Sequence, residues 1–168
     1  IESSNLLEKI RFLITSENCD FIIFDHVSIA ISGLDESSMN ERKAIDMLMT
    51  QLRSLVEETG AGIVVVSHLR KGDTKSTPFE QGGTISLDDL RGSGSLKQLP
   101  DTVLALERNQ QADEEDSRNV LKIRVLKCRF TGNTGLAGYL KFNKTKNVLE
   151  DVDPLEIKTE GEDDKCQF

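Results

Sequence analysis

Two short apolar runs separated by an amphipathic segment constrain the fold of this chain more than any other feature. Residues 21–24 and 62–66 are apolar almost throughout, without the alternation that a half-exposed strand shows. Between them, apolar residues recur at helical spacing from Ala44 to Val56, and the pattern closes at Gly60. Because parallel strands need a helical crossover, the sequence predicts strand, helix and strand in a parallel sheet that is covered on both faces.

Other segments extend this α/β pattern. Leu6 to Ile14 have the spacing of a first helix, and Ser38 with Glu41 has the spacing of a capping box at the start of the second. Residues 70–83 predict a loop, and a short helix is expected to begin near Leu87 or Arg91.

Three more strands are predicted towards the C-terminus. Residues 102–106 form the first of them, and residues 120–127 and 138–142 predict an antiparallel hairpin at the end of the sheet. The acidic cluster at residues 113–116 is assigned to a loop. Residues 1–150 are therefore expected to form one domain, and residues 151–168 an acidic, disordered tail.

Composition excludes several classes of protein. The 168 residues are 37% hydrophobic, which is enough for one core, and no apolar run is long enough to span a bilayer. The three cysteines are far apart, which argues against a disulfide framework and favours a reducing cytosolic setting. The formal net charge is −8, but eight acidic residues against two lysines from residue 150 onward contribute −6, which leaves −2 for the rest of the chain.

A polar residue follows each apolar run. Asp25 comes at the carboxyl end of the first predicted strand, where open α/β sheets bind ligands. It predicts a Walker B carboxylate that holds Mg²⁺, directly or through water, during phosphoryl transfer; the alternative is an Asp that only ends a strand. His68 ends the neighbouring strand and is placed to hydrogen-bond a terminal phosphate, whereas the alternative is a His satisfied by backbone groups.

Two groups of basic residues point to further sites. Arg70, Lys71 and Lys75 form a loop suited to gripping a nucleic-acid backbone, although a solvated charged loop has the same composition. Arg129 lies between a strand and a Gly-containing turn, with Lys127 two residues earlier. This placement suits an arginine finger supplied to a neighbouring subunit, and the alternative is a surface pair on an edge strand.

Five motifs occur in order with compatible spacing, at residues 24–26, 66–69, 89–96, 105–110 and 127–132. Together they resemble the hexameric replicative DNA helicases, in particular the helicase half of phage bifunctional primase-helicases. The mitochondrial helicase Twinkle and bacterial DnaB are more distant relatives in the same resemblance. It covers about residues 1–150, and the set of motifs is specific although each one alone is weak.

The resemblance implies a RecA-like P-loop NTPase core: a mostly parallel sheet flanked by helices, with a C-terminal antiparallel hairpin. It also implies a ring of six subunits in the cytosol of a bacterium or of a phage-infected host. The ring would hydrolyse ATP or dTTP with Mg²⁺ to move five-prime to three-prime along single-stranded DNA during replication.

The same resemblance implies a role for each candidate residue. Asp25 corresponds to the Walker B acid and Mg²⁺ ligand, His68 to the phosphate sensor, and Arg129 to the finger, with Lys127 beside it at the nucleotide. Arg108 and Phe142 fall at the positions that sandwich the nucleotide base. The positions that face DNA in the channel are Arg70, Lys71, Lys75, Gly92, Ser93 and Gly94.

One part of the family pattern is missing from the sequence. No Walker A motif, in which Gly, four variable residues, Gly and Lys precede Ser or Thr, occurs in the 168 residues. The chain is therefore expected to be the C-terminal part of a motor that is incomplete at its N-terminus. By itself it is expected to bind nucleotide weakly and to hydrolyse essentially none.

The sequence also suggests further binding partners, and it leaves two alternative classes of protein open. A primase domain is an expected partner, and the acidic tail resembles tails that dock DNA polymerase, with a solubilising tail as the alternative. A RecA-like or RadA-like recombination ATPase would share the fold. A non-enzymatic subunit that lends Arg129 to a partner's site would explain the missing motif without truncation.

Overall fold

The structure, a computed structural model, describes residues 3–28, 41–70, 77–92 and 94–153, with side chains from residue 6 onward. The chain divides into two compact units, each described by itself below. Unit 1 comprises residues 1–71 and 87–101, and unit 2 comprises residues 72–86 and 102–168. The chain therefore passes from one unit to the other three times, at residues 71–72, 86–87 and 101–102.

Unit 1 is built on a parallel pair of strands. β1 (Phe21–Phe24) pairs in parallel with β2 (Gly62–Val65), with Ile23 opposite Val64. The connection between them contains α3 (Glu41–Thr59), which stops at Gly60, a residue in the left-handed conformation with φ of 75°. The predicted order of strand, helix and strand is confirmed. Ser38 of the predicted capping box lies outside the described residues.

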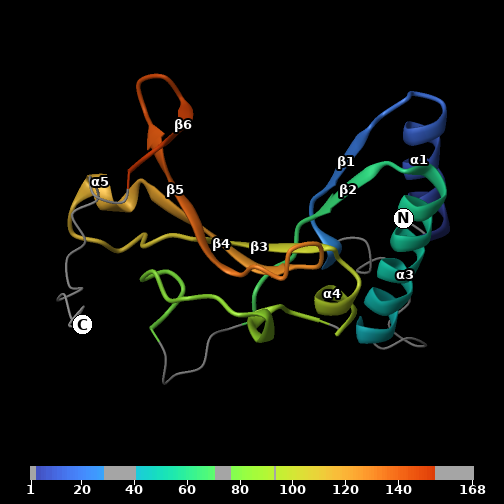
Figure 1. The fold of residues 1–168 in the computed structure, drawn as a ribbon, viewed down its shortest axis with the longest axis horizontal. Coiled ribbons are helices and arrows are strands. Elements are labelled where there is room, and N and C mark those ends of the chain that lie inside the picture. The colour runs from blue at the N-terminus through green and yellow to red at the C-terminus, as the bar shows by residue number, and fades with distance from the viewer. Residues whose placement is uncertain (1–2, 29–40, 71–76, 93, 154–168) are drawn as a thin grey trace. The chain divides into compact units, whose positions relative to one another are not determined.

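The core of unit 1 lies between its helices and the parallel strands. α1 (Ser3–Thr15) contacts both α3 and β1, and α3 also contacts β2 (Figure 1). The apolar stripe of α3 is buried as its helical spacing predicts. Its buried members are Ala44, Ile45, Leu48, Met49, Leu52 and Leu55.

The prediction that these strands are covered on both faces is wrong for the described residues. Phe21 and Ile23 of β1 are 73% and 74% exposed, and Val64 of β2 is 52% exposed. The alternate residues Ile22 and Phe24 are half-buried. The reason is that α1 and α3, the helices that contact the strands, lie on the same side of them and leave the other face open (Figure 1).

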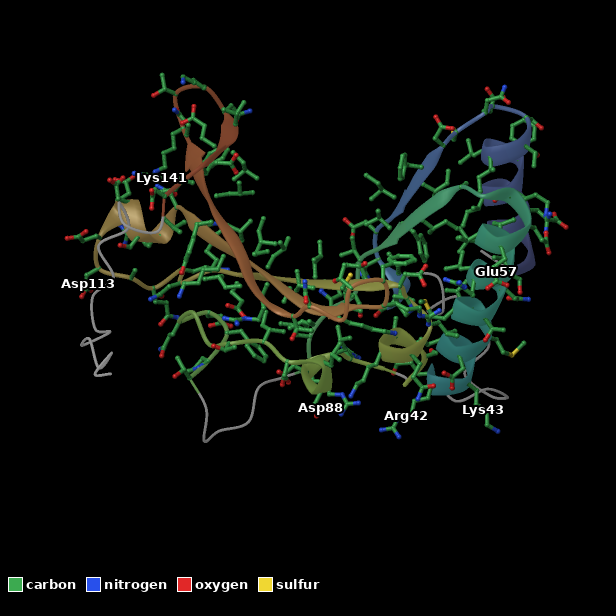
Figure 2. All side chains as sticks on the ribbon, viewed as in Figure 1. Arg42, Lys43, Glu57, Asp88, Asp113 and Lys141 are labelled. Carbon is green, nitrogen blue, oxygen red and sulfur yellow. The ribbon has the colours of Figure 1, made fainter. Side chains whose placement is uncertain are left out.

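The predicted short helix of unit 1 appears as two pieces. A 3-10 turn, η1 (Leu87–Asp89), is followed after an irregular stretch by α4 (Ser95–Gln98), which packs on α3. Ser95 and Leu96 of α4 are buried. Lys97 of α4 forms an ion pair with Asp88 of η1 at 2.5 Å, and Figure 2 shows Asp88 at the surface. This pair joins the two pieces.

Unit 2 is an antiparallel sheet with the strand order β3–β4–β5–β6. The strands are β3 (Thr102–Glu107), β4 (Val120–Cys128), β5 (Gly135–Asn143) and β6 (Val148–Asp151). The predicted hairpin is present as β4 and β5, although β5 begins at residue 135 rather than 138. β6 extends the sheet and has no counterpart among the predicted strands. The described strands thus form one parallel and one antiparallel sheet, and β3 belongs to the latter.

The prediction of a loop at residues 113–116 is wrong at its second half, because α5 (Glu115–Arg118) begins there. Glu115 and Asp116 lie in the first turn and Arg118 in the last, which is the charge order that a helix dipole favours. Lys144 pairs with Glu115, and Lys141 of β5 pairs with Asp116 at 3.0 Å, close to α5 in Figure 2. Tertiary ion pairs therefore supplement a helix that is short for its own stability.

Candidate functional site

Two predicted site residues lie where β1 and β2 end, in unit 1. The Asp25 side chain directly after β1 is exposed and makes no hydrogen bond or ion pair within the described residues. The His68 ring, just beyond β2, meets the His26 ring edge to face, with centroids 4.1 Å apart. The Val27 amide donates to the Val66 carbonyl at 3.0 Å, which continues the pairing past both strands. The carboxyl ends of the parallel pair thus bring His26 against His68, next to Asp25.

The segment after His68 pairs with residues 89–92 of the same unit. Leu69 and Leu90 form an antiparallel bridge, and the Arg70 amide donates to the Asp89 carbonyl at 2.7 Å. The Arg91 amide donates to the His68 carbonyl at 3.1 Å. The Arg70 guanidinium also approaches the Gly92 carbonyl at 3.5 Å. Backbone hydrogen bonds therefore connect His68 directly to the glycine-containing segment that follows Asp89.

The predicted DNA-facing residues are only partly described. Gly92 has φ of 116°, and a Cβ atom there would lie 2.6 Å from Cδ1 of the buried Ile45, so the backbone conformation and this contact both favour a glycine. Gly94 precedes α4 with φ of −58°, and a Cβ atom there would make only an ordinary contact with Gln98 Nε2 at 4.0 Å. Arg70 is exposed. The remaining members of this predicted group, Lys71, Lys75 and Ser93, lie outside the described residues.

A cavity of about 580 Å³ in unit 2 brings together two of the predicted nucleotide-binding residues. The residues that line it are Arg108, Asn119, Leu121, Phe142, Asn147, Val148 and Leu149. This volume falls within the range of small-molecule sites in proteins. The Arg108 Nε donates to the Arg118 carbonyl at 2.5 Å, and the Phe142 amide donates to the Asn119 carbonyl at 3.0 Å. The C-terminal end of α5 therefore holds both predicted base-stacking residues.

The predicted finger residue lies in unit 2, in the turn after β4. Arg129 is exposed, and the Gly132 amide closes the turn by donating to the Cys128 carbonyl at 2.9 Å. Hydrogen bonds from Thr131 lower the pKa of the Cys128 thiol. Lys127 lies in β4 opposite Val103 and does not line the cavity that contains Arg108. Lys127 and Arg129 each take part in a polar or electrostatic interaction.

Three residues at these places carry no predicted role. His26 packs on His68. Because His26 directly follows Asp25 at the end of a predicted strand, its place near the candidate site could have been predicted from the sequence. Asn119 and Asn147 line the cavity beside Arg108 and Phe142. They lie in turns, after α5 and before β6, where neither periodicity nor motif spacing marks them.

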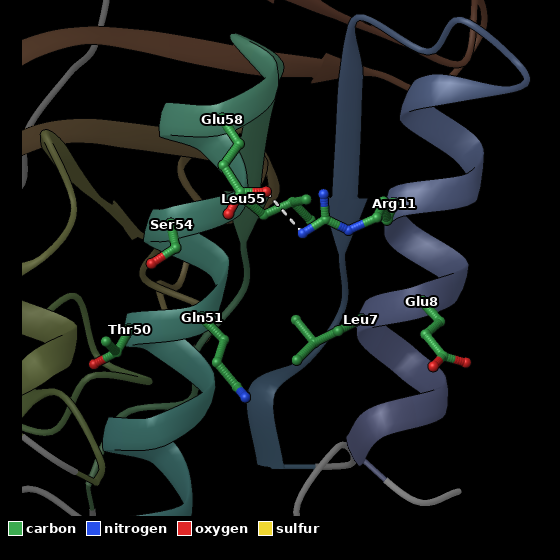
Figure 3. A pocket seen from close by; sticks show the side chains of 8 residues that line it. All are labelled: Leu7, Glu8, Arg11, Thr50, Gln51, Ser54, Leu55 and Glu58. Atoms are coloured by element: carbon green, nitrogen blue, oxygen red, sulfur yellow. Dashed lines mark ion pairs between the residues drawn. The ribbon is translucent and has the colours of Figure 1, made fainter.

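A groove of about 280 Å³ separates α1 from α3 in unit 1 (Figure 3). The Arg11 guanidinium pairs with the Glu58 carboxylate across it at 2.8 Å. No predicted site residue lines this groove. Within the described ranges, no group of three or more His, Cys, Asp or Glu residues is placed to hold a metal ion. None of the helices described is long and apolar enough to cross a membrane.

Comparison with known proteins places these features in a family context. Residues 1–151 match the family described as the DnaB-like helicase C-terminal domain. The chain is 48% identical over 149 residues to the DNA helicase/primase of Enterobacteria phage T3, which covers 89% of this chain and 25% of that protein. It is 26% identical over 151 residues to the replicative DNA helicase DnaC of Bacillus subtilis, covering 88% of this chain and 32% of the relative. The chain thus spans about a quarter to a third of the length of these two relatives.

One solved structure, an ATPase domain, has a similar fold. It superposes with a TM-score of 0.67 at 20% sequence identity, covering 90% of this chain and 52% of the solved one. This likeness confirms the predicted α/β fold class, and the sequence matches confirm the resemblance to replicative helicases.

Proposed function

Because this chain belongs to the family of DnaB-like helicase C-terminal domains, we propose that it forms part of the motor of a replicative DNA helicase. Two relatives point the same way, since one is named a DNA helicase/primase and the other a replicative DNA helicase. In this proposal a ring of six subunits hydrolyses a nucleoside triphosphate. Hydrolysis moves the ring five-prime to three-prime along single-stranded DNA and unwinds the duplex during replication.

The observation that carries the proposal is the pairing between the segment after His68 and residues 89–92. In the proposed motor, His68 senses the terminal phosphate, and Arg70 with the glycines beyond Arg91 faces DNA. The Leu69–Leu90 bridge and the hydrogen bond from the Arg91 amide to the His68 carbonyl join these two parts within unit 1. Because backbone hydrogen bonds make this connection directly, a shift of His68 on phosphate release would move the DNA-facing segment with it.

Asp25 suits the proposed role of a Mg²⁺ ligand. Its carboxylate is exposed and has no protein partner within the described residues, so it is available to a cation. Mg²⁺ usually keeps several waters and binds through one or two carboxylates together with substrate phosphates. When bound, the ion neutralises charge on the phosphates during transfer. His68, just beyond the adjacent strand β2, is proposed to donate a hydrogen bond to the terminal phosphate.

Arg108 and Phe142 are proposed to hold the base of the nucleotide, ATP or dTTP, in the cavity of unit 2. A guanidinium plane and an aromatic ring both stack favourably on a base. The Arg108 side chain and the Phe142 backbone are anchored to consecutive carbonyls, at Arg118 and Asn119, which supports this role because it fixes the guanidinium and the strand that carries the ring. Lys127 and Arg129 are proposed to act on the phosphates of a nucleotide held by a neighbouring subunit.

The proposed partners follow from this function. They are single-stranded DNA and the identical subunits of the ring, and the name of the phage T3 relative suggests a primase domain as well. Docking of a DNA polymerase on the acidic tail remains a prediction, since residues 154–168 lie outside the described part of the chain. We propose that the protein acts in the cytosol of a bacterium or of a phage-infected host, and the origin of the two relatives, a bacterium and an enterobacterial phage, supports this proposal.

Arg129→Ala in a complete protein that contains this chain tests the proposed function. We expect DNA-stimulated hydrolysis to fall about 10³-fold or more, because arginine fingers contribute about that much in nucleotide-hydrolysing GTPases, while nucleotide binding persists. Strand separation on a forked duplex should be lost in parallel. The control is Arg11→Ala, which removes an exposed arginine that pairs with Glu58 in unit 1 and should leave both activities unchanged.

Each contrary result has a distinct meaning. Unchanged turnover in Arg129→Ala would refute the finger. A complete protein that assembles but neither hydrolyses nucleotide nor unwinds DNA would refute the motor and favour the non-enzymatic subunit. Strand exchange between homologous duplexes, with no unwinding, would favour the recombination ATPase.

A further inference from the structure

We propose that Asn119 and Asn147 read the edge of the nucleobase and set which nucleoside triphosphate the protein prefers. The proposal rests on the proposed function, because it takes the cavity between Arg108 and Phe142 as the base site. The proposal adds a basis for preferring one nucleobase over another at that site, which the stacking residues alone do not provide.

Stacking by Arg108 and Phe142 discriminates weakly between bases. Every base presents a π-face, so a guanidinium plane and an aromatic ring accept all of them. The aliphatic lining residues, Leu121, Val148 and Leu149, offer no side-chain hydrogen-bonding group. Besides Arg108, the polar side chains that line this cavity are therefore those of Asn119 and Asn147.

A carboxamide is well suited to reading a base edge. Asn carries an acceptor oxygen and an NH₂ donor side by side, which matches a base that presents a donor next to an acceptor. Within the described part of the chain, neither the Asn119 nor the Asn147 side chain has a hydrogen-bond partner. Both amides are consequently available to a ligand, and a base that leaves them unpaired once water is displaced binds less well.

The backbone holds both asparagines in defined places. The Asn119 carbonyl accepts the Phe142 amide at 3.0 Å, and the preceding carbonyl, of Arg118, accepts the Arg108 Nε at 2.5 Å. Asn119 thus lies next to the anchor points of both stacking groups. Asn147 ends the turn between β5 and β6 with φ of 56°, a conformation that Asn tolerates better than most side chains. Both asparagines therefore line the cavity from turns of defined backbone conformation.

The test is base selectivity in a complete protein that contains this chain. The dissociation constants of ATP, GTP, CTP and dTTP are measured calorimetrically without DNA, for the wild type and for Asn119→Ala and Asn147→Gly. Asn147→Gly removes the amide and keeps the left-handed backbone. We expect the ratio between the most and least preferred nucleotide to fall about tenfold in at least one variant, which is the effect of one lost hydrogen bond.

Two further variants sharpen the result. Asn18→Gly is the matched control, because Asn18 is exposed in unit 1 with φ of 55° and does not line the cavity. It should leave the ratio unchanged. Asn147→Asp keeps the shape and replaces the donor with an acceptor, so it should change the order of preference even if a smaller residue disturbs the fold.

The outcomes separate this proposal from the one on which it rests. A selectivity ratio that stays unchanged in Asn119→Ala, Asn147→Gly and Asn147→Asp overturns the role of the asparagines. Arg108→Ala and Phe142→Ala test the base site itself and should weaken the binding of all four nucleotides together. Unchanged affinity in those two variants would refute the base site, whatever the asparagine variants do.

Discussion

Gly92 and Gly94 lie two residues apart in the predicted DNA-facing segment, yet only Gly92 has a positive φ and a close contact at the position of a Cβ atom. We expect Gly92→Ala to lower the free energy of unfolding by about 1–3 kcal/mol, because the new Cβ meets Ile45 and an L side chain is strained at φ of 116°. Gly94→Ala, whose new Cβ would meet only the Gln98 Nε2 atom at 4.0 Å and whose φ is −58°, should lower it by less than about 1 kcal/mol. Urea unfolding measures both.

A further substitution separates the two causes at Gly92. Ile45→Val removes the Cδ1 atom that the new Cβ would meet, so in the Gly92→Ala background it should restore only the part of the loss that comes from the clash. Equal unfolding midpoints for Gly92→Ala and Gly94→Ala would contradict the packing argument.

The Glu107 carboxylate in unit 2 is 2% exposed and depends on Arg124. Arg124 donates to it through Nε at 2.7 Å and through Nη2 at 3.3 Å, and the Ile85 amide donates at 2.9 Å. Arg124→Ala leaves a buried charge without its partner, so we expect a loss of about 3 kcal/mol in the free energy of unfolding.

The surface pair of Lys141 and Asp116 supplies the comparison for Arg124. Lys141→Ala should cost less than about 1 kcal/mol, because exposed ion pairs contribute little. In Glu107→Gln the charge is gone, and the further change Arg124→Ala should then be much milder. If Arg124→Ala lowers the free energy of unfolding by a similar amount in the wild type and in Glu107→Gln, the ion pair is not the cause of the loss.

Asp25 and His68 were predictable because each follows an apolar run that forms a strand, and strand ends are where such folds bind ligands. The cavity residues Asn119 and Asn147 were not, because their place depends on how α5 and the turn before β6 fold against the sheet. A polar residue in a turn looks the same in sequence whether it faces solvent or a cavity. The position of a strand end therefore marks Asp25 and His68 in the sequence, whereas no comparable signal marks the two asparagines.

Acid should loosen the β5–β6 hairpin, because hydrogen bonds from Lys146 at 2.8 Å and Asn143 at 3.1 Å lower the pKa of the Glu150 carboxyl below its usual value near 4.5. A lowered pKa in the folded state means that the ionised form is favoured there. The stabilisation is present above about pH 4.5 and is lost as the pH falls through the folded-state pKa.

Carboxyl NMR titration checks this prediction directly. The Glu150 midpoint should lie below that of an unfolded reference peptide, and Lys146→Ala should raise it. Lys144→Ala, whose lysine pairs with Glu115 instead, is the control and should leave the Glu150 midpoint in place. A Glu150 midpoint that does not move in Lys146→Ala would rule out the hydrogen bond as the cause.

Secondary structure was predictable where the pattern of apolar residues in the sequence marks the element that packs in the core. The apolar stripe of α3 has the period of a helix, and β1 and β2 coincide with continuous apolar runs. α5 and β6 have four residues each, and their contacts come from elsewhere in unit 2: ion pairs from Lys141 and Lys144 for α5, and pairing with β5 for β6. Neither α5 nor β6 contains a continuous apolar run of the kind that marks β1 and β2, so the local pattern does not indicate them.

Taken as an isolated chain, the protein should associate through the open face of β1 and β2. Ile23 and Val64 are paired in register, and each has more than half of its surface exposed. We expect the double substitution Ile23→Thr with Val64→Thr to reduce aggregation and binding of a hydrophobic dye, because exposed apolar patches promote both.

Ile22→Thr is the matched control for that face. It changes the same residue type in the same strand, but on the half-buried side, so it should lower stability without reducing dye binding. Equal dye binding by the wild type and the double variant would contradict the prediction.

The family of the chain was predictable from the order of its motifs. The open face of β1 and β2 was not, because continuous apolar runs indicate strands that are covered on both sides.

The division of the chain into units has a practical consequence for protein engineering. Each unit is assembled from two separate stretches of sequence, and the junctions fall at residues 71–72, 86–87 and 101–102. Neither unit corresponds to one continuous stretch of the gene, so shortening the coding region from either end removes part of one unit or of both. A protease that cuts at any one junction leaves the two units covalently tethered through the other two, and only denaturation would then separate the fragments of the backbone.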